Sequence, residues 1–194
     1  MAETKFTGAA KAELPHGGEY SGELVDGKPH GYGVMKFPNG DLYEGEWIEG
    51  EMDGLGEYFI YDSQWGSFTK KYKGEFSKCL RHGKGCMTYE DFSKYQGNWQ
   101  NNQRTGHGVC WFANGDRFLG IWKFDQMLRG VYSIAESGDW YDGEIKDGVF
   151  NGYGKYYWRS GNLFEGTFMG GKPHNGVLIL SDGKMTEIVD GEIR

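Results

Sequence analysis

Glycine-flanked histidines come nearest to a catalytic motif in this sequence. His30-Gly-Tyr-Gly33 and His16-Gly-Gly18 have the form of loops whose backbone N–H groups stabilise an oxyanion in esterases. Such a loop works with a nucleophilic serine in a Gly-x-Ser-x-Gly turn, which the sequence does not contain. Because the histidine–glycine motif also recurs along the chain, it indicates a structural role. We therefore predict no catalytic residue and no enzymatic activity.

Cysteine and charge content narrow the class of protein further. Cys79, Cys86 and Cys110 are odd in number and form no Cys-x-x-Cys pair, which favours a reducing, cytoplasmic compartment. The formal net charge is −7 over 194 residues, which disfavours general nucleic-acid binding because that requires a basic face. No stretch approaches the ~20 apolar residues of a membrane span, and no secretory leader is evident.

A 23-residue repeat organises the chain. An aromatic residue followed two residues later by glycine recurs seven times, with starts 23 residues apart except for one gap of 29. We number each repeat from this aromatic residue as position 1. Most of the 34 glycines then fall at positions 3, 8, 12, 14 and 21, and a bulky residue stands at position 5 of every repeat. The glycine content, far above the usual ~7%, is therefore architectural.

The alternation within each repeat predicts two β-strands. Positions 1, 3 and 5 alternate, as do positions 14, 16 and 18, with the period of a strand. We predict one hairpin per repeat with its loop at positions 8–11. Pairing in which position numbers sum to nineteen would place each bulky position 5 over the glycine at position 14. The predicted fold is all-β, an elongated single-layer antiparallel sheet of tandem hairpins.

The predicted organisation is a single repeat array over residues 1–194. It comprises a partial repeat at 6–19, full repeats starting at 20, 43, 72, 95, 118, 141 and 164, an insertion within 61–71 and a C-terminal partial strand at 187–193. Repeat five has Arg129 and Val131 in place of the glycines at positions 12 and 14, and repeat seven has Asn175 and Val177. Because Arg and Val rarely adopt the left-handed conformation, we expect a locally different hairpin in repeat five.

Histidines at position 11 and glutamates at position 4 could suggest metal or ligand binding. Successive repeats would lie about 10 Å apart, whereas a metal is bound at ~2 Å, so the histidines cannot share one ion. We expect loop histidines, no metal and no cofactor. For the glutamates we expect a solvated face that pairs with Lys or Arg across strands rather than a binding stripe. The residues are His30, His82 and His174, and Glu23, Glu46, Glu75 and Glu144.

Two segments carry a family resemblance. Tyr43-Glu-Gly-Glu-Trp47 followed by Gly54-Leu-Gly56, and Tyr20-Ser-Gly-Glu-Leu24 followed by His30-Gly-Tyr-Gly33, resemble the MORN (membrane occupation and recognition nexus) repeat. The resemblance covers about residues 6–193. It implies an extended single-sheet scaffold without catalytic activity of its own. Family members serve in radial spokes and other axonemal or cytoskeletal assemblies, and some hold a partner's helix or peptide in the groove of the sheet.

The second face of the sheet, at positions 2, 4, 15 and 17, changes from polar to apolar from repeat four onward. A soluble monomer rarely leaves such a surface bare. We predict that this face binds an apolar helix or an extended segment of a protein partner, or mediates self-association; the alternative is that sheet twist or the C-terminal segment 182–194 covers it. The predicted residues are Val109, Trp111, Leu119, Ile121, Tyr132, Ile134, Tyr157, Leu178 and Leu180.

Two further surfaces are candidates for binding. An aromatic groove is predicted on the first face, and a basic block near the third repeat could take an acidic protein segment or an anionic lipid. The groove residues are Tyr43, Trp47, Tyr72, Phe76, Tyr95, Trp99, Phe118, Trp122 and Trp158. The basic residues are Lys70, Lys71, Lys73, Lys78, Arg81 and Lys84.

Together these features predict a non-enzymatic scaffold or adaptor in a multi-protein complex. By family resemblance, we expect a ciliary or axonemal assembly of the radial-spoke kind, or another cytoskeletal assembly in the cytoplasm. The alternative is a peripheral membrane module that binds phosphoinositides through the basic residues 70–84, and the net charge of −7 argues against it.

Overall fold

The computed structural model describes residues 6–13 and 17–194, with side chains described from residue 17 onward. The chain divides into two compact units. The N-terminal unit comprises Met1–Tyr89 with Asn98–Asn102, and the C-terminal unit comprises Glu90–Gly97 with Gln103–Arg194. The division falls within one strand, β8 (Lys94–Gln100).

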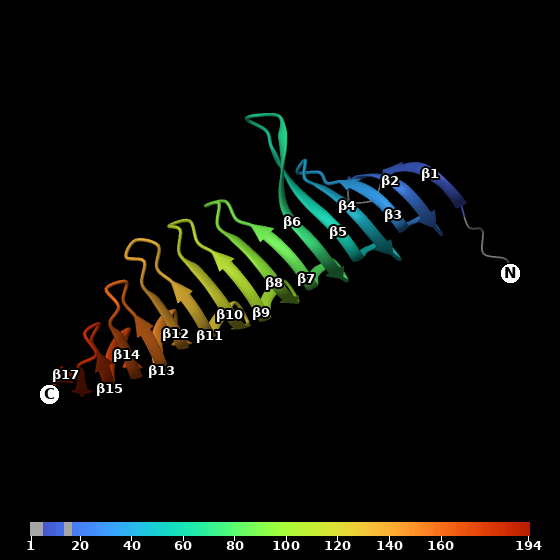
Figure 1. The fold of residues 1–194 in the computed structure, drawn as a ribbon. Helices are drawn as coiled ribbons and strands as arrows, with labels where there is room; N and C mark the ends of the chain where they lie inside the picture. Colours follow the sequence, from blue (N-terminus) through green and yellow to red (C-terminus); the bar gives the residue numbers. More distant parts are fainter. Residues whose placement is uncertain (1–5, 14–16) are drawn as a thin grey trace. The chain divides into compact units, whose positions relative to one another are not determined.

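Antiparallel strands make up each unit, and within each unit one strand pairs with the next, from β1 to β7 and from β9 to β17 (Figure 1). The N-terminal unit contains β1 (Phe6–Glu13), β2 (Glu19–Val25), β3 (Lys28–Lys36), β4 (Leu42–Ile48), β5 (Glu51–Asp62), β6 (Ser67–Ser77) and β7 (Leu80–Thr88). The C-terminal unit contains β9 (Gln103–Trp111), β10 (Arg117–Lys123), β11 (Gln126–Ser133), β12 (Trp140–Lys146), β13 (Val149–Tyr157), β14 (Leu163–Met169), β15 (Lys172–Ile179), β16 (Met185–Val189) and β17 (Glu192–Ile193). The prediction of an all-β, single-layer antiparallel sheet of tandem hairpins is confirmed. Among the described residues, none forms a helix long and apolar enough to cross a lipid bilayer.

The hairpin turns are shorter, and begin earlier, than predicted. In repeat one, Val25 pairs with Lys28, so Asp26 and Gly27 at positions 7 and 8 form a two-residue turn. Their φ angles are 50° and 75°. Positive φ at both central residues is the requirement of a type I′ turn, which matches the twist of the flanking strands. The predicted loop at positions 8–11 was therefore wrong.

A bulge next to each turn sets the register. Gly22 pairs with Gly33, so positions 3 and 14 face each other, and the register shifts between Gly22 and Glu23. The same pairing joins Gly45 to Gly56. Beyond the bulge, the position numbers of two paired residues thus sum to seventeen rather than the predicted nineteen. The reason is that the second strand has two unpaired residues, Gly31 and Tyr32 in repeat one. Glycines therefore face glycines across the strands.

The core is a layer of aromatic rings on one face of each unit, which we call the aromatic face. A methyl group on either Gly22 or Gly33 would overlap the Tyr20 ring, so the ring at position 1 covers the glycine pair. The prediction that position 5 covers position 14 was wrong in this detail. Instead, Trp47 at position 5 packs edge-on against Tyr20 and Tyr43, with ring centroids 5.5 and 5.1 Å apart. Such edge-to-face packing is the favoured geometry of aromatic pairs.

The insertion at 61–71 lengthens one hairpin. Strands β5 and β6 continue their pairing to Asp62 and Ser67, and this hairpin extends beyond the neighbouring loops (Figure 1). The Tyr61 and Phe68 rings lie 5.2 Å apart on the extension.

Candidate functional site

The strand pairing in repeats five and seven is shifted by one residue relative to repeat one. A locally different hairpin was expected for repeat five. There Phe118 pairs with Tyr132, and Phe164 pairs with Leu178. Position 1 thus faces position 15, whereas it faces position 16 at Tyr20–Met35. The bulge contains one unpaired residue rather than two, and position 12 no longer needs a left-handed backbone.

This shift moves four residues of the predicted second face. A one-residue change of register exchanges the two faces of a strand, so Tyr132 and Leu178, which lie opposite the position 1 rings, belong to the aromatic face. Ile134 and Leu180 hold the place taken by Phe112 and Trp158 in other repeats, and those two rings contact tyrosines of the aromatic face. Placing Tyr132, Ile134, Leu178 and Leu180 on the second face was therefore wrong.

Some of the remaining residues of the second face lie close together on β9 and β10, although Ile121 is opposite His107 and Arg129 rather than apolar residues. Leu119 lies opposite both Val109 and Val131. Trp111 is opposite Arg117 on the next strand, and its ring lies 5.8 Å from that guanidinium. Leu119 and Ile121 are 45% and 40% exposed. We call Val109, Leu119, Ile121 and Val131 the second-face patch, and partner binding there stays a prediction.

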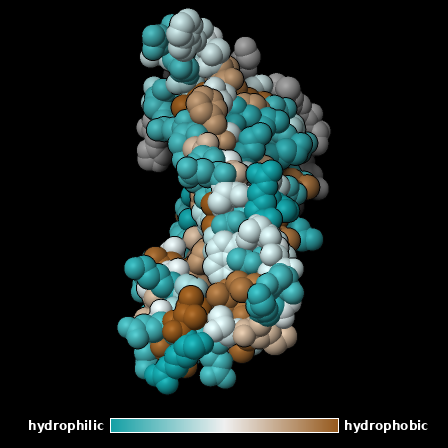
Figure 2. Space-filling model, turned by 60° about the vertical axis from the view of Figure 1, so that its left-hand side comes forward, coloured by the Kyte–Doolittle hydropathy of each residue, from teal (hydrophilic) through white to brown (hydrophobic). Residues whose placement is uncertain are grey.

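Tyr157 lies in a different apolar row. Its ring stacks on Trp140 with centroids 3.6 Å apart, and Leu163 and Ile179 continue the row on β14 and β15. Figure 2 shows hydrophobic side chains exposed among hydrophilic ones at the C-terminal end of the chain. The C-terminal strand β16 pairs with β15 and so extends the sheet in its own plane.

The predicted groove residues are mostly core residues. Eight of the nine are buried, and Trp158 is half-buried. Tyr72 and Phe76 are the members that also line a cavity, described below. Because these rings are mostly buried, a partner on the aromatic face could contact only their edges and the neighbouring side chains.

The basic block is divided between surfaces. Lys70 and Lys73 both pair with Glu57, at 2.7 Å for Lys73, and their hydrogen bonds hold the pKa of Glu57 below its ordinary value. Lys78 lies in a hairpin turn with φ of 50°, and Lys84 is exposed. Lys71 and Arg81 line the cavity on the aromatic face. These six residues do not form one cationic patch.

The glutamates at position 4 have a structural role that the sequence reading missed. The Glu46 carboxylate accepts a 2.6 Å hydrogen bond from the backbone N–H of Leu55, and Glu75 accepts one of 2.8 Å from Lys84. A methyl group at Gly54 would overlap the Glu46 carboxylate. These carboxylates therefore close the two-residue bulge, and the expected cross-strand pairing with Lys or Arg was wrong for them.

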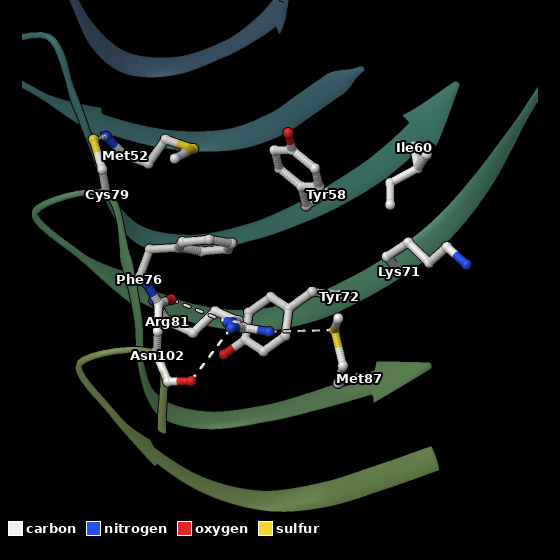
Figure 3. A pocket seen from close by; sticks show the side chains of 10 residues that line it. All are labelled: Met52, Tyr58, Ile60, Lys71, Tyr72, Phe76, Cys79, Arg81, Met87 and Asn102. Atoms are coloured by element: carbon white, nitrogen blue, oxygen red, sulfur yellow. Dashed lines mark hydrogen bonds between the residues drawn. The ribbon is translucent and has the colours of Figure 1, made fainter. Parts of the chain in front are cut away.

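A cavity of about 230 Å³ opens on the aromatic face of the N-terminal unit (Figure 3). Its walls are mostly apolar, and within the described residues they contain no carboxylate. The lining residues are Met52, Tyr58, Ile60, Lys71, Tyr72, Phe76, Cys79, Arg81, Met87 and Asn102. In the same described part of the chain, no three His, Cys, Asp or Glu side chains gather as ligands for a metal ion.

Arg81 is the central polar group of this cavity. Its guanidinium lies 4.7 Å from the Trp99 ring and 5.9 Å from the Tyr72 ring. Nε donates to Asn102 Oδ1 at 3.0 Å, and Nη2 donates to the Asn102 carbonyl oxygen at 3.3 Å. Stacking and hydrogen bonding fix the direction of the side chain, so the remaining N–H groups are directed in advance.

The same arrangement of an arginine on a tryptophan ring recurs one repeat later, where the partner of the arginine is charged. Arg104 lies 4.4 Å from the Trp122 ring and donates from Nε to Asp125 Oδ1 at 2.8 Å. Asp125 holds the turn position of Asn102, so Arg104 has a carboxylate partner where Arg81 has a neutral amide. Sequence reasoning identified Arg81 as basic, but without the register it could not place Asn102 against it.

Comparison with family models gives six matches. The model described as MORN repeat matches residues 20–42, 43–65, 72–94, 95–117, 141–163 and 164–185, which is more than half of the chain. Among the seven full repeats, repeat five at residues 118–140 is the one without a match.

Other comparisons concern sequence relatives and solved structures. No curated protein sequence gives a significant match. The wild-type TCP10 domain of Danio rerio CPAP, solved in complex with a peptide of Danio rerio STIL, is 14% identical over 94% of this chain and 84% of that chain, with a TM-score of 0.50. The Drosophila melanogaster SAS-4 (dCPAP) TCP domain, in complex with a proline-rich motif of Ana2 (dSTIL), is 11% identical over 100% and 92%, with a TM-score of 0.33. At 14% identity, the similarity to the Danio rerio TCP10 domain concerns the fold alone.

Proposed function

Because the chain belongs to the MORN repeat family, we propose that it is a non-enzymatic scaffold that binds an extended segment of a protein partner on the aromatic face of its N-terminal unit. The observation that carries the proposal is the cavity of about 230 Å³ lined by Ile60, Tyr72, Arg81 and Met87 among others. An apolar cavity with a few directed polar groups is the usual form of a recognition site.

The structural relative with the shared fold supports this choice of ligand. The TCP10 domain of Danio rerio CPAP was solved with a bound peptide, so a sheet of this kind can present a peptide-binding surface. The proposal extends to a multi-protein assembly of the cytoskeleton in the cytoplasm, such as a cilium or axoneme, where other members of the family serve. The second-face patch would give such a scaffold a second contact, with another partner or another copy of the chain.

Membrane binding has less support from the same residues. Lys70 and Lys73 share the carboxylate of Glu57, whereas Lys71 and Arg81 line the cavity of the aromatic face. Polybasic attraction to lipid adds up only when the charges lie together near the bilayer. Sedimentation with phosphoinositide vesicles at physiological salt tests this alternative, and binding that persists there would favour it.

Site-specific photo-crosslinking tests the proposed surface. A benzoylphenylalanine at Ile60, in the cavity, and another at Leu119, in the second-face patch, would each be exposed to extract from ciliated cells. We expect a saturable crosslink at Ile60 that excess unlabelled wild-type protein suppresses, and mass spectrometry then identifies the partner. A crosslink at Leu119 alone would move the binding surface to the other face, and none at either position would contradict protein binding by the sheet.

A further inference from the structure

We infer that the cavity around Arg81 selects an acidic side chain, aspartate or glutamate, flanked by an apolar side chain in the bound segment. This inference rests on the proposed function, whose partner chemistry it specifies. It comes from the difference between two arginines that occupy the same place in successive repeats.

Arg81 has hydrogen-bonding capacity left over. A guanidinium carries five N–H donors. Two go to Asn102 and one goes to the Met87 sulfur at 3.5 Å, which is a weak acceptor. Within the described residues, no carboxylate forms an ion pair with Arg81. Two N–H donors of Arg81, which lines the cavity, therefore remain without an acceptor among the described residues.

Arg104 shows what satisfies such a cation. Its ring stacking and backbone contact match those of Arg81, with Nη2 donating to the Asp125 carbonyl oxygen at 3.1 Å. The difference is the carboxylate of Asp125, which pairs with Nε. The chain therefore neutralises one arginine internally and leaves the charge of the other for an external anion.

The cavity walls favour a protein carboxylate over a lipid headgroup. Met52, Ile60, Phe76 and Met87 line the same cavity with apolar surface, and the volume of about 230 Å³ exceeds what a carboxylate alone fills. In Figure 3 the Lys71 ammonium is directed away from Arg81. Arg81, with the Lys71 ammonium directed away from it and apolar side chains in the same cavity, suits a single negative charge with an apolar neighbour, whereas a phosphoinositide headgroup carries several charges.

The test uses two peptides that differ in one group, acetyl-Gly-Leu-Glu-Phe-Gly-amide and its glutamine counterpart. The full chain is labelled with ¹³C at the methionine methyl groups, so that Met87 and Met52 report from the cavity. We expect the glutamate peptide to shift the Met87 signal and to bind about tenfold more tightly than the glutamine peptide, since a charge-assisted hydrogen bond is roughly twice as strong as a neutral one.

A matched pair of variants assigns the preference to Arg81. Asn102→Asp gives Arg81 the partner that Arg104 has, and aspartate tolerates the positive φ of 68° at this position. We expect it to abolish the difference in affinity between the glutamate and the glutamine peptide. Asp125→Asn alters the corresponding site in the C-terminal unit and should leave the Met87 response as in the wild type.

Several results would overturn the inference. Equal binding of the two peptides would end acid selection while leaving peptide binding in place. Absence of both responses would also overturn it, and the crosslink at Ile60 then decides whether the proposed function falls as well. A shift of Met87 by inorganic phosphate or by vesicles containing a phosphoinositide, without a response to the glutamate peptide, would assign the cavity to phosphate instead.

Discussion

The Tyr43 hydroxyl donates a 3.1 Å hydrogen bond to the carbonyl oxygen of Glu46, three residues later on the same strand. The equivalent bond joins Tyr72 to Glu75 at 3.0 Å and Tyr141 to Glu144 at 2.8 Å. In each case the acceptor lies where the register shift interrupts the strand ladder. The position 1 tyrosine thus supplies a donor to a carbonyl at the bulge, as buried backbone groups require.

Three features of the bulge occur together in four repeats and are all absent from repeats five and seven, whereas repeat four keeps Tyr95 and Gly106 but has Asn98 at position 4. Repeats one, two, three and six combine tyrosine at position 1, glutamate at position 4 and glycine at position 12. Repeat five instead has Phe118, Ile121 and Arg129, and repeat seven has Phe164, Thr167 and Asn175. Because the shorter bulge has no left-handed glycine beneath the position 4 side chain, that side chain need not be a carboxylate. Ile121 therefore has a structural explanation, whether or not a partner contacts it.

Tyr43→Phe should destabilise the N-terminal unit by about 1–2 kcal/mol, because it leaves the Glu46 carbonyl without this donor. The midpoint of urea unfolding, followed by far-ultraviolet circular dichroism, measures the change. Tyr32→Phe is the matched control: its hydroxyl bonds to the Glu44 carboxylate in an exposed position, so its removal should cost less than about 0.5 kcal/mol. Equal effects of the two substitutions would refute the role assigned to the Tyr43 hydroxyl.

Gly85→Ala should destabilise the same unit by about 1–3 kcal/mol, as overpacking of a filled core does. The nearest neighbours of the added methyl group are all atoms of the Tyr72 ring, which it would overlap. Replacing Tyr72 by Leu should reduce the added cost of Gly85→Ala, because the overlapping ring is gone. The four unfolding midpoints form a double-mutant cycle, and additivity within error would show that the ring does not cover Gly85.

The fold could be predicted from the sequence because one motif occurs seven times, mostly 23 residues apart, but the register of the strands could not. A single turn misplaced by one or two residues changes which side chains face each other. The Asp26-Gly27 pair carried the correct type I′ signal, and the break at Arg129 marked the shifted hairpin of repeat five. The error therefore fell on Tyr132 and Leu178, whose faces depend on the number of unpaired residues in a bulge.

The cavity was beyond the sequence for a related reason. Arg81 and Asn102 are 21 residues apart and meet because the turn that follows β8 lies against β7 of the preceding hairpin. The charge difference from Arg104 and Asp125 becomes visible once this contact is known. Likewise, the sequence alone predicts Glu46 and Glu75 to be solvated. Their structural role becomes clear only when the backbone N–H groups of the bulge that donate to them are located.

Lowering the pH should weaken the C-terminal unit partly through Asp139. The Arg159 backbone N–H, helped by the Tyr156 hydroxyl at 2.8 Å, lowers the pKa of Asp139 against a smaller opposing effect of burial. A carboxyl whose pKa is lowered on folding stabilises the protein above its unfolded pKa of ~3.9 and loses that contribution as the pH falls through the folded value. Stability should therefore fall between about pH 5 and pH 2.

Asp139→Asn isolates this contribution. Asparagine fits here, since Asn162 holds the same place in the next repeat and accepts the Ser181 backbone N–H at 2.9 Å. Wild type should be the more stable protein at pH 6, and the difference in urea midpoint should shrink as the pH approaches 3. A difference that stays constant with pH would exclude Asp139 as a source of the acid sensitivity.

Replacing Leu119 and Ile121 together by aspartate tests the second-face patch. Both side chains are nearly half exposed. The free energy of unfolding, measured by urea titration, should therefore change by no more than about 1 kcal/mol in total. If the patch is a docking surface, two charges in its centre should abolish partner capture or self-association, since desolvating them costs several kcal/mol. Sedimentation velocity and capture from ciliated-cell extract measure these outcomes.

Val177→Asp is the control, because Val177 is exposed on the same face but lies between Glu165 and Glu187 rather than among apolar residues. Unchanged binding by the folded double variant would remove this patch from the binding surface and leave the aromatic face as the site of docking.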